Sequence, residues 1–521
     1  MDLNDISKKI HVFILLNDLI SLILNHFFYI IINKVKFMNV TYNNLEKKIL
    51  SYTPLDIRKL KKAYQYASSY HKNQLRASGE SYIIHPLNIA YILACMNADM
   101  DTIIAGLLHD VVEDTDSTLD DIEKQFNKTI RELVDGVTKM TKLDFSSQKE
   151  LTASNLRKLI VSLARDPRII IIKLVDRLHN MRTLEYKSLK KQQEKALETL
   201  EIYVPLAYYI GASKIKDELE NIAFKYLKPS IYGDINKQRE ELKDETKDIL
   251  ENVKKDLNNL LKKNGIKADL EIRYKDNYSI YKKLLTNNKF ETIHDMIGIK
   301  VIVKNVKDCY LSLMLIHEMF TPINNYFKDY IAKPKTNMYK SIHTTVFGPD
   351  NRLIQFQIRT QEMEKIAIYG LTSYWFKYKN NARINMQKDL ENNFQFFKSI
   401  KELDSTILDN IEFVSLIKKE LFSSNIYVYT TTGEVIELPN GSTVVDFAYK
   451  IHTDIGNSMV AAIVNNEAVS FDYVLENQDR VRIVTDSKAY VPKEEWLNYA
   501  KTTTARSKIR EFIKENEEEN K

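Results

Sequence analysis

Residues 107–115 read LLHDVVEDT, a leucine pair followed by His109-Asp110 and then by Glu113-Asp114. On a helix, Glu113 would lie about one turn after His109 and Asp114 one turn after Asp110, so all four polar side chains share a broad face. One imidazole and three carboxylates form a costly cluster unless a cation or a phosphate-bound metal balances the charge. The competing interpretation is an exposed acidic stripe, because charge runs are commonly just solvated.

The residues around this motif repeat apolar side chains at the three- and four-residue spacing of helices. The chain has only 12 Gly and 10 Pro in 521 residues, which favours long helices over a turn-rich sandwich. We therefore predict an all-helical domain over 38–228. Its expected helices lie at 60–70, 88–96, 100–112, 119–136, 153–164 and 192–209.

Two further polar segments belong to the same domain. Residues 173–183 place Asp176, Asn180 and Thr183 at spacings of four and three on one helical face, after an apolar run. Residues 71–86 form a polar, turn-like segment between two helices. These segments supply imidazole, carboxylate and guanidinium groups that tertiary packing is expected to bring to the motif at 107–115.

Mixed imidazole and carboxylate ligands suit an octahedral ion such as Mn²⁺ better than they suit a thiolate-bound zinc. The candidate ligands are His85, His109, Asp110 and Asp176. Such an ion lowers the pKa of a bound water and polarises a phosphoryl group. We expect Glu113 or Asp114 to position the attacking water.

After the helical domain the pattern changes to a mixture of helices and short β-rich runs, which indicates an α/β domain. A long charged helix is expected at its start, over 232–263. We expect the helix that follows residue 494, near the end of the chain, to be solvated. The expected units are an α/β domain over 229–400, a helical linker over 401–424, a small β-rich unit over 425–487, and a basic helix with an acidic tail over 488–521.

The composition excludes several classes of protein. Hydrophobic residues make up 44% and charged residues 28%, which excludes a disordered or collagen-like chain. Two cysteines, Cys95 and Cys309, cannot form a disulfide framework, so we expect a reducing compartment and a cytoplasmic protein. The net charge of +6 is too balanced to identify a nucleic-acid partner by itself.

Residues 1–37 form an apolar extension. Ile10 to Ile32 is strongly apolar, but Asp18 and other polar residues interrupt it, and a central Asp costs about 3 kcal/mol in a bilayer-spanning helix. No small-residue cleavage site follows. We therefore favour translation from Met38, with 1–37 as a mis-assigned start, over a membrane span.

Three motifs carry a resemblance to a known family: HxxQxRxSGExYxxHP at 71–86, LLHDVVEDT at 107–115 and KLVDRLHNMRTL at 173–184. They closely resemble the hydrolase domain of the RelA/SpoT family, long enzymes that make and degrade the alarmone (p)ppGpp in the stringent response. The resemblance implies a helical, His-Asp type phosphohydrolase. In that family the domain uses Mn²⁺ to remove the 3′-pyrophosphate of ppGpp or pppGpp, which gives GDP or GTP.

The resemblance also implies a role for each matching residue. The metal ligands are His85, His109, Asp110 and Asp176, and the residues on the catalytic water are Glu113 and Asp114. The nucleotide contacts are Arg76, Ser78, Asn180 and Thr183. Ala77 stands where the family usually has Lys, which is expected to weaken one nucleotide contact and to leave the ligands untouched.

The second domain resembles the family's synthetase domain, an α/β fold of nucleotidyltransferase type. That domain transfers the β,γ-pyrophosphate of ATP to the 3′-hydroxyl of GDP or GTP and needs Mg²⁺, for which Asp295 is the matching ligand. The residues that match the ATP-phosphate site are Arg273, Lys275, Ser279 and Lys283, with a solvated basic strand end as the alternative. The residues that match the guanine-nucleotide pocket are Lys328, Lys335, Asn337, Tyr339 and His343. Tyr339 is expected to stack on the base.

The synthetase domain departs from the family at its catalytic base. The family's Glu-x-Gln-Ile-Arg-Thr motif reads Gln355-Phe-Gln-Ile-Arg-Thr, and an amide neither accepts the hydroxyl proton nor brings charge to the metal. The other departures are Ile272, Lys300, Tyr326, Ile368 and Tyr374. Loss of a general base costs about 10² to 10⁴ in rate. We therefore expect active hydrolysis and weak or absent synthesis.

The third unit, over 425–487, resembles a TGS domain of β-grasp type through its residues 428–453, and the family uses that domain to sense the 3′ end of uncharged tRNA. His452 is the candidate tRNA contact, although a lone His near a helix end is more often structural. Residues 496–510 match the basic helix that follows. Full-length relatives continue into zinc-finger-like and ACT or RRM-like modules that this sequence lacks, so we expect weak ribosome stimulation.

Three functional hypotheses follow from these motifs. The favoured one is a (p)ppGpp hydrolase with a weak synthetase that binds GDP or GTP and ATP. The second is a fully bifunctional synthetase and hydrolase. The third, of another class, is a regulator that binds a nucleotide or tRNA without catalysis, and the intact ligand set at His85, His109, Asp110 and Asp176 argues against it.

Overall fold

The structure is a computed structural model. The residues that it describes are 40–52, 57–138, 148–287, 289–290, 293–335, 337–378, 400, 404, 409–422, 425–486 and 492–519. The expected apolar extension over 1–37 and part of the expected linker over 401–424 lie outside these residues. Within the described ranges, no helix combines the length and apolar character that crossing a membrane requires.

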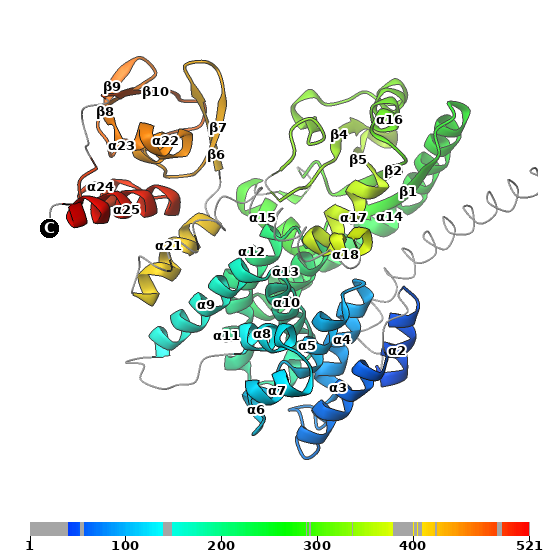
Figure 1. The fold of residues 1–521 in the computed structure, drawn as a ribbon. Helices are drawn as coiled ribbons and strands as arrows, with labels where there is room; N and C mark the ends of the chain where they lie inside the picture. Colours follow the sequence, from blue (N-terminus) through cyan, green and yellow to red (C-terminus); the bar gives the residue numbers. More distant parts are fainter. Residues whose placement is uncertain are drawn as a thin grey trace, which may run out of the picture.

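The first unit consists of helices, as predicted (Figure 1). Its helices are α2 (Tyr42–Leu50), α3 (Ile57–Tyr70), α4 (Ile84–Cys95), α5 (Met100–Leu108), α6 (Val111–Asp114), α7 (Leu119–Gln125), α8 (Lys128–Val137), α9 (Gln148–Arg165), α10 (Pro167–Arg182), α11 (Leu189–Glu198), α12 (Val204–Tyr209) and α13 (Ser213–Leu227). A π-helical turn at Thr199–Tyr203 joins α11 to α12.

Helices α4, α5 and α10 form the centre of this unit and pack against one another. Every side chain of α4 from His85 to Cys95 is buried, and α10 is buried along almost all its length. Asp99 caps α5 by accepting from the backbone N–H of Thr102. Asp166 caps α10 in the same way, with Pro at the first helical position. Polar residues on such buried helices need internal partners.

The expected continuous helix over 100–112 is wrong, because α5 ends at Leu108 and a turn at His109-Asp110 separates it from α6. His109 Nδ1 lies 2.9 Å from the carbonyl oxygen of Gly106. In an uninterrupted helix that oxygen would accept the backbone N–H of Asp110. The imidazole of His109 therefore occupies the carbonyl oxygen of Gly106 in place of the backbone N–H of Asp110, at the point where α5 ends.

The second unit is a mixed sheet with helices, which confirms the predicted α/β class. Its helices are α14 (Pro229–Lys263), α15 (Asn277–Asn287), α16 (Val306–Met319), α17 (Gln361–Tyr369) and α18 (Ser373–Tyr378). Its strands are β1 (Ala268–Tyr274), β2 (Ile297–Val303), β3 (Lys328–Asp329), β4 (Ile342–Phe347) and β5 (Leu353–Thr360). The order is β1-β2-β5-β4-β3, in which only β2 and β5 run parallel.

The third unit has the β-grasp arrangement that the sequence predicted (Figure 1). Its strands are β6 (Asn425–Thr430), β7 (Val435–Pro439), β8 (Met459–Val464), β9 (Glu467–Val469) and β10 (Arg480–Thr485). The strand order is β7-β6-β10-β8-β9, with β6 and β10 parallel. Helices α22 (Val444–Ile451) and α23 (Thr453–Asn457) complete it.

The expected solvated helix after residue 494 is wrong in its exposure. Two helices, α24 (Trp496–Tyr499) and α25 (Thr503–Glu519), pack their apolar faces against α22. Asp446 of α22 is buried and accepts hydrogen bonds from the backbone N–H groups of Lys501 and Thr502. The regularly spaced apolar residues of this segment therefore form a packing face. The high charge of the segment had suggested an exposed helix instead.

Helix α21 (Asn410–Phe422) connects the third unit to the helical unit. On one side Arg157 of α9 lies 4.7 Å from the ring centroid of Phe413. On the other side Arg506 and Arg510 of α25 contact Glu412 at 3.4 and 2.9 Å. The third unit is thus joined to α9, the helix that precedes α10 in the chain.

The first two units meet at Gly370, directly after α17. Gly370 has φ of 55°, and a Cβ there would collide with the carbonyl oxygen of Ile210. The same oxygen accepts the backbone N–H of Leu371 at 2.8 Å. The joint therefore requires a residue with neither a side chain nor a preference for negative φ.

We predict that Gly370→Ala destabilises the protein by more than the roughly 1 to 3 kcal/mol of backbone strain, because the added methyl also separates the two units. The measurement is the thermal unfolding midpoint, which should fall by several degrees. Gly433→Ala is the matched control, since Gly433 also has positive φ but open space around its Cβ position. Equal shifts for both variants would contradict the collision.

Candidate functional site

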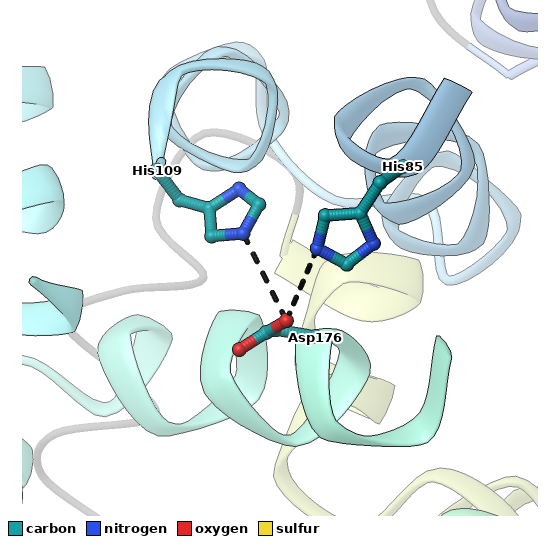
Figure 2. Close-up of side chains that lie close together, drawn as sticks. All are labelled: His85, His109 and Asp176. Carbon is teal, nitrogen blue, oxygen red and sulfur yellow. Dashed lines mark ion pairs between the residues drawn. The ribbon is translucent and has the colours of Figure 1, made fainter. Parts of the chain in front are cut away.

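Three helices bring two imidazoles and a carboxylate together (Figure 2). His85 lies in the first turn of α4, His109 caps the end of α5, and Asp176 lies in α10. Asp176 Oδ1 is 3.3 Å from His85 Nε2 and 3.8 Å from His109 Nε2. One potential ligand atom from each residue lies within 4.8 Å of the other two. This spacing allows the three atoms to surround one ion.

Asp110 places two more oxygen atoms beside these residues. Its Oδ1 is 3.0 Å from His109 Nε2, and its Oδ2 is 3.5 Å from His85 Nε2. Burial raises the pKa of Asp110, but the imidazole of His109 outweighs it, so the pKa lies below its ordinary value. Burial also raises the pKa of Asp176, and the charge of Lys173, 3.2 Å away, brings it well below the ordinary value. Both side chains are therefore carboxylates at neutral pH.

The donor atoms fit a divalent cation. His109 Nε2 is buried, and although Asp110 Oδ1 lies 3.0 Å away, no described residue forms a well-aligned hydrogen bond with it. A buried polar atom without a partner costs free energy, and a cation beside it would remove that cost. Two imidazoles with two carboxylates and no thiolate are typical of ions such as Mn²⁺ rather than of structural zinc. The site therefore suits a divalent ion, while the choice of Mn²⁺ remains a prediction.

An open pocket of about 280 Å³ lies against these residues. Its lining residues are Leu75, Arg76, Ala77, Ser78, Tyr82, His85, Asp110, Glu113, Asp114, Lys173, Asp176, Asn180, Thr183, Tyr186 and Lys187. The structure thus brings the predicted hydrolase residues to one cavity, except for His109, which is buried next to it. The pocket offers cations and carboxylates on facing elements, as a phosphate-bearing ligand with a metal would require.

Arg76 is tied to the candidate metal site by a row of hydrogen bonds. Its guanidinium donates to Asn180 Oδ1 at 3.0 Å, and Asn180 Nδ2 donates to Asp176 Oδ1 at 2.6 Å. Asn180 therefore orients both a cation of the pocket wall and a candidate ligand. Its spacing of four from Asp176 on α10 was visible in the sequence, whereas its contact with Arg76 depends on the tertiary fold.

The hydroxyls of Ser78 and Thr183 have local partners. Ser78 Oγ donates to Glu80 Oε2 at 3.2 Å, and Thr183 Oγ1 donates to the carbonyl oxygen of His179 at 3.2 Å. A hydroxyl that donates still accepts through its lone pairs. Both groups can therefore receive a hydrogen bond from a ligand in the pocket.

Sequence reasoning assigned no role to Tyr82, which the structure places between two carboxylates. Its hydroxyl is 2.9 Å from Asp110 Oδ2 and 2.8 Å from Asp114 Oδ2. Lys173, Tyr186 and Lys187 also line the pocket and were not assigned. For Lys173 the sequence did offer a signal, because it lies three residues before Asp176 and a helix therefore places the two side chains about one turn apart.

His179 is a further residue that the sequence did not single out. Its Nδ1 lies 2.9 Å from Nδ1 of His85, and both rings are buried. Burial lowers the pKa of His179 well below its ordinary value, and repulsion from His85, Arg76 and Arg182 acts in the same direction. The ring is therefore a neutral imidazole at neutral pH.

In the second unit, several residues predicted for the synthetase gather around β5. The ammonium of Lys275 forms an ion pair with Asp295 Oδ2, whereas Asp295 Oδ1 is buried and has no hydrogen-bond partner among the residues that the structure describes. Burial raises the pKa of Asp295, but Lys275 outweighs it and lowers the pKa below the ordinary value; Lys283 adds to this effect. Arg273 lies 3.5 Å from Gln355 Oε1.

Gln355 is buried in β5, where its side-chain oxygen contacts Arg273 and Gln357. Gln357 Nε2 donates to Gln355 Oε1 at 3.0 Å, and Arg359 donates to Gln357 Oε1 at 3.2 Å. This row of amides adds no negative charge to the centre. Asp295 is therefore the one carboxylate among the predicted synthetase residues, and it is already paired with Lys275.

The predicted guanine pocket is partly assembled. Tyr339 and His343 are joined by a hydrogen bond of 2.8 Å, and Lys335 Nζ lies 5.3 Å from the centroid of the Tyr339 ring. Burial, followed by repulsion from Arg359 and Lys335, lowers the pKa of His343 to about 3. Lys328 pairs with His343 across β3 and β4.

Ser279 and Asn337 are placed differently from the other predicted synthetase residues. The backbone N–H of Ser279 donates to Asp276 Oδ1 at 2.9 Å, at the start of α15. Asn337 Oδ1 lies 3.4 Å from the backbone nitrogen of Tyr339, and its main-chain oxygen approaches Gly211 of the helical unit. The backbone of Ser279 and the side chain of Asn337 are thus engaged in local turns, and the predicted nucleotide contacts of both residues remain predictions.

His452 lies at the start of α23 with 65% of its side chain exposed. Its Nδ1 accepts from the backbone N–H of Asp454 at 3.3 Å, so the ring caps the helix. His452 therefore has a structural role as a helix cap, which was the alternative that the sequence allowed. The exposed remainder of the ring leaves the predicted tRNA contact sterically open.

Three family models match the chain. They are the HD domain over 63–212, the region found in RelA / SpoT proteins over 272–383, and the TGS domain over 426–485. A GTP pyrophosphokinase of Myxococcus xanthus is 42% identical over 468 residues, which cover 89% of this chain and 61% of that protein.

A guanosine-3′,5′-bis(diphosphate) 3′-pyrophosphohydrolase of Aquifex aeolicus is 40% identical over 481 residues, which cover 91% of this chain and 67% of that protein. The chain belongs to the RelA/SpoT family. It spans 61% of the length of the Myxococcus member of that family. Among solved structures, a metazoan ortholog of SpoT that hydrolyses ppGpp is 34% identical, with a TM-score of 0.23, and the match covers 26% of this chain and 74% of that one.

These RelA/SpoT relatives carry names for two different reactions, the transfer of pyrophosphate to GTP and the removal of a 3′-pyrophosphate. Family membership therefore does not choose between the two activities in this chain. The choice depends on the residues present at each of the two centres.

We predict that Lys173→Met destabilises the ion-free protein by about 3 to 5 kcal/mol, because it leaves the buried carboxylate of Asp176 unpaired. The depressed pKa of Asp176 means that this pair stabilises the fold above the pKa of an unfolded Asp, and that the effect is lost as the pH falls through the folded value. Thermal unfolding at pH 7 in a chelator measures the loss. Added Mn²⁺ should raise the midpoint more in the variant than in the native protein.

The matched control is Lys195→Met, which removes an ion pair of the same spacing, with Glu198, from a largely exposed lysine. Its effect should be below about 1 kcal/mol. A Lys173→Met variant as stable as this control would show that Lys173 does not compensate the buried charge.

Proposed function

We propose that the helical domain of this chain hydrolyses (p)ppGpp, removing the 3′-pyrophosphate to leave GDP or GTP, with Mn²⁺ as its cofactor. The observation that carries the proposal is the convergence of His85, His109 and Asp176 beside an open pocket lined by cations and carboxylates. The name of the Aquifex relative, which describes this reaction, supports the proposal.

The residues that would hold the ion are His85, His109, Asp110 and Asp176. A bound divalent ion lowers the pKa of a coordinated water and polarises a phosphoryl oxygen. Glu113 and Asp114 line the same pocket and are the carboxylates available to orient a water molecule and to take its proton. The Tyr82 hydroxyl contacts Asp114 Oδ2 at 2.8 Å, which limits the rotation of that carboxylate.

The chain's cations account for phosphate binding. Arg76 lines the pocket from the 71–86 segment, and Lys187 lines it from just beyond the end of α10. A guanidinium fixed by Asn180 suits a phosphate through two parallel N–H groups. In the reaction, the water oxygen bonds to the phosphorus on the 3′-oxygen, that phosphorus–oxygen bond breaks, and the 3′-oxygen takes up a proton as pyrophosphate leaves.

We further propose that the synthetase domain transfers pyrophosphate weakly or not at all. The amide of Gln355 cannot accept the proton of the 3′-hydroxyl, and its oxygen already accepts from Gln357. Asp295, the proposed ligand of Mg²⁺, has no second carboxylate beside it among the predicted synthetase residues. Cationic side chains around β5 remain suited to ATP and to GDP or GTP, so the domain binds nucleotides without efficient transfer.

A bifunctional enzyme is the second candidate. Its support is Asp295, whose Oδ1 is buried and without a partner, as a metal ligand would be in the ion-free state. The Myxococcus relative is named for pyrophosphate transfer. In this alternative another group takes the proton that Gln355 cannot take.

For the TGS domain we propose a contact with uncharged tRNA through His452. The exposed imidazole supports this proposal, since an accessible ring can stack on an unpaired base.

We predict that His109→Ala abolishes Mn²⁺-dependent release of pyrophosphate from ppGpp, because it removes a buried ligand that no neighbour replaces. The assay measures pyrophosphate against Mn²⁺ concentration. His317→Ala is the matched control, as His317 is a hydrogen-bonded histidine of the other catalytic unit. Full activity in the His109 variant would contradict the assignment of the metal site.

We predict that the chain carrying Asp110→Ala, in which product survives, forms little or no ppGpp from ATP and GDP. Adding Gln355→Glu should raise synthesis, by up to about 10² to 10⁴ if the general base alone is missing. Chromatography of labelled nucleotides measures both. Ordinary synthesis with Gln355 in place would instead establish the bifunctional enzyme.

A further inference from the structure

The two imidazoles of the proposed metal site are held by different kinds of partner. His109 Nδ1 lies 2.9 Å from the carbonyl oxygen of Gly106. His85 Nδ1 lies 2.9 Å from Nδ1 of another imidazole, that of His179. In both rings Nε2 is the atom that faces the carboxylates of Asp110 and Asp176.

This difference matters because a metal ligand nitrogen must carry no proton. If Nε2 of His85 and His109 binds an ion, each ring keeps its proton on Nδ1 and must donate it. A carbonyl oxygen is always an acceptor, so Gly106 fixes the His109 tautomer without further conditions. An imidazole nitrogen accepts only through a lone pair, so His179 must keep its own proton on Nε2.

His179 does not reach the substrate pocket. The neighbouring residues Asn180 and Thr183 line it, whereas His179 is not among the lining residues and is buried behind His85. The rings of His179 and His85 have centroids 4.9 Å apart and are tilted by 52°, which suits an in-plane hydrogen bond better than stacking. The role of His179 therefore acts through His85 and not through contact with a nucleotide.

We propose that His179 is a positioning residue that fixes the tautomer and ring orientation of His85 for a divalent ion. The inference rests on the proposed function only in taking His85 as a ligand. It adds an acceptor from α10, the helix that also carries Asp176, so one helix supplies both a ligand and the support of a second ligand on α4. Loss of such a support typically weakens metal binding about 10- to 100-fold.

The test compares side chains that keep or lose the acceptor. His179→Asn places an amide oxygen close to the position of Nδ1, and His179→Leu provides no acceptor. His179→Phe fills the ring volume without an acceptor, and it replaces the Leu variant if that protein does not fold. His317→Leu is the control, because it removes a histidine that is hydrogen-bonded to Thr344 in the other catalytic unit.

The measurement is binding of Mn²⁺ alone to the nucleotide-free full chain, followed by the paramagnetic resonance of free Mn²⁺. We expect about 10- to 100-fold weaker binding for Leu and Phe, and binding close to native for Asn and for the control. With saturating Mn²⁺, the KM for ppGpp should stay unchanged in all variants, because His179 does not line the pocket.

Equal Mn²⁺ affinity in the native, Leu and Phe proteins would overturn the role of His179 and leave the proposed hydrolase intact. Equal weakening by Asn and Leu would also overturn it, since the acceptor would then not be the important feature. A native chain that binds no Mn²⁺ would overturn the proposed metal site together with this inference.

Discussion

The negative charge of Asp110 and Asp176 is the constraint on which the helical domain depends. Asp176 is buried, Asp110 is half-buried and both are ionised, and such charges without compensation would be prohibitive. Lys173 compensates part of that charge from the same helix. The imidazoles of His85 and His109 also contact the two carboxylates. The Tyr82 hydroxyl and the Asn180 amide are further polar neighbours. The central packing of α4, α5 and α10 is what holds these groups close together.

The two units proposed to be catalytic differ most in their balance of charge. The helical site combines carboxylates, imidazoles and a pocket wall with Arg76 and Lys187. The sheet site has cations in abundance, but its proposed metal ligand Asp295 is paired with Lys275, and Gln355 contributes an amide. Phosphate binding requires only the cations, whereas transfer also requires a base and a metal. This difference is the physical basis for proposing hydrolysis as the main activity.

A series of side-chain contacts connects the third unit to the helical unit. Asp446 binds the backbone before α25, α25 contacts Glu412 of α21, and α21 packs on α9 around Arg157. Helix α9 leads directly into α10, which carries Asp176. Figure 1 shows α21 lying between α25 and α9. Each contact pairs a buried or half-buried charge with a fixed partner, so the segments cannot shift independently without exposing unpaired groups.

The sequence by itself determined the three fold classes and predicted the types of ligand, because helical spacing and side-chain chemistry are local properties. The prediction that Gln355 replaces a catalytic carboxylate came from the resemblance to the RelA/SpoT family. The sequence placed Asp176, Asn180 and Thr183 on one side correctly, since the first two lie in α10, Thr183 is the cap that ends it, and all three line the pocket. Only the tertiary structure decided that the helix stops at Leu108, that α25 is packed rather than solvated, that His179 contacts His85, and that Tyr82 contacts two carboxylates. These features depend on which buried surfaces meet between segments that lie tens of residues apart in the sequence. The partner of a buried polar group is therefore set by tertiary packing and not by its neighbours in the chain.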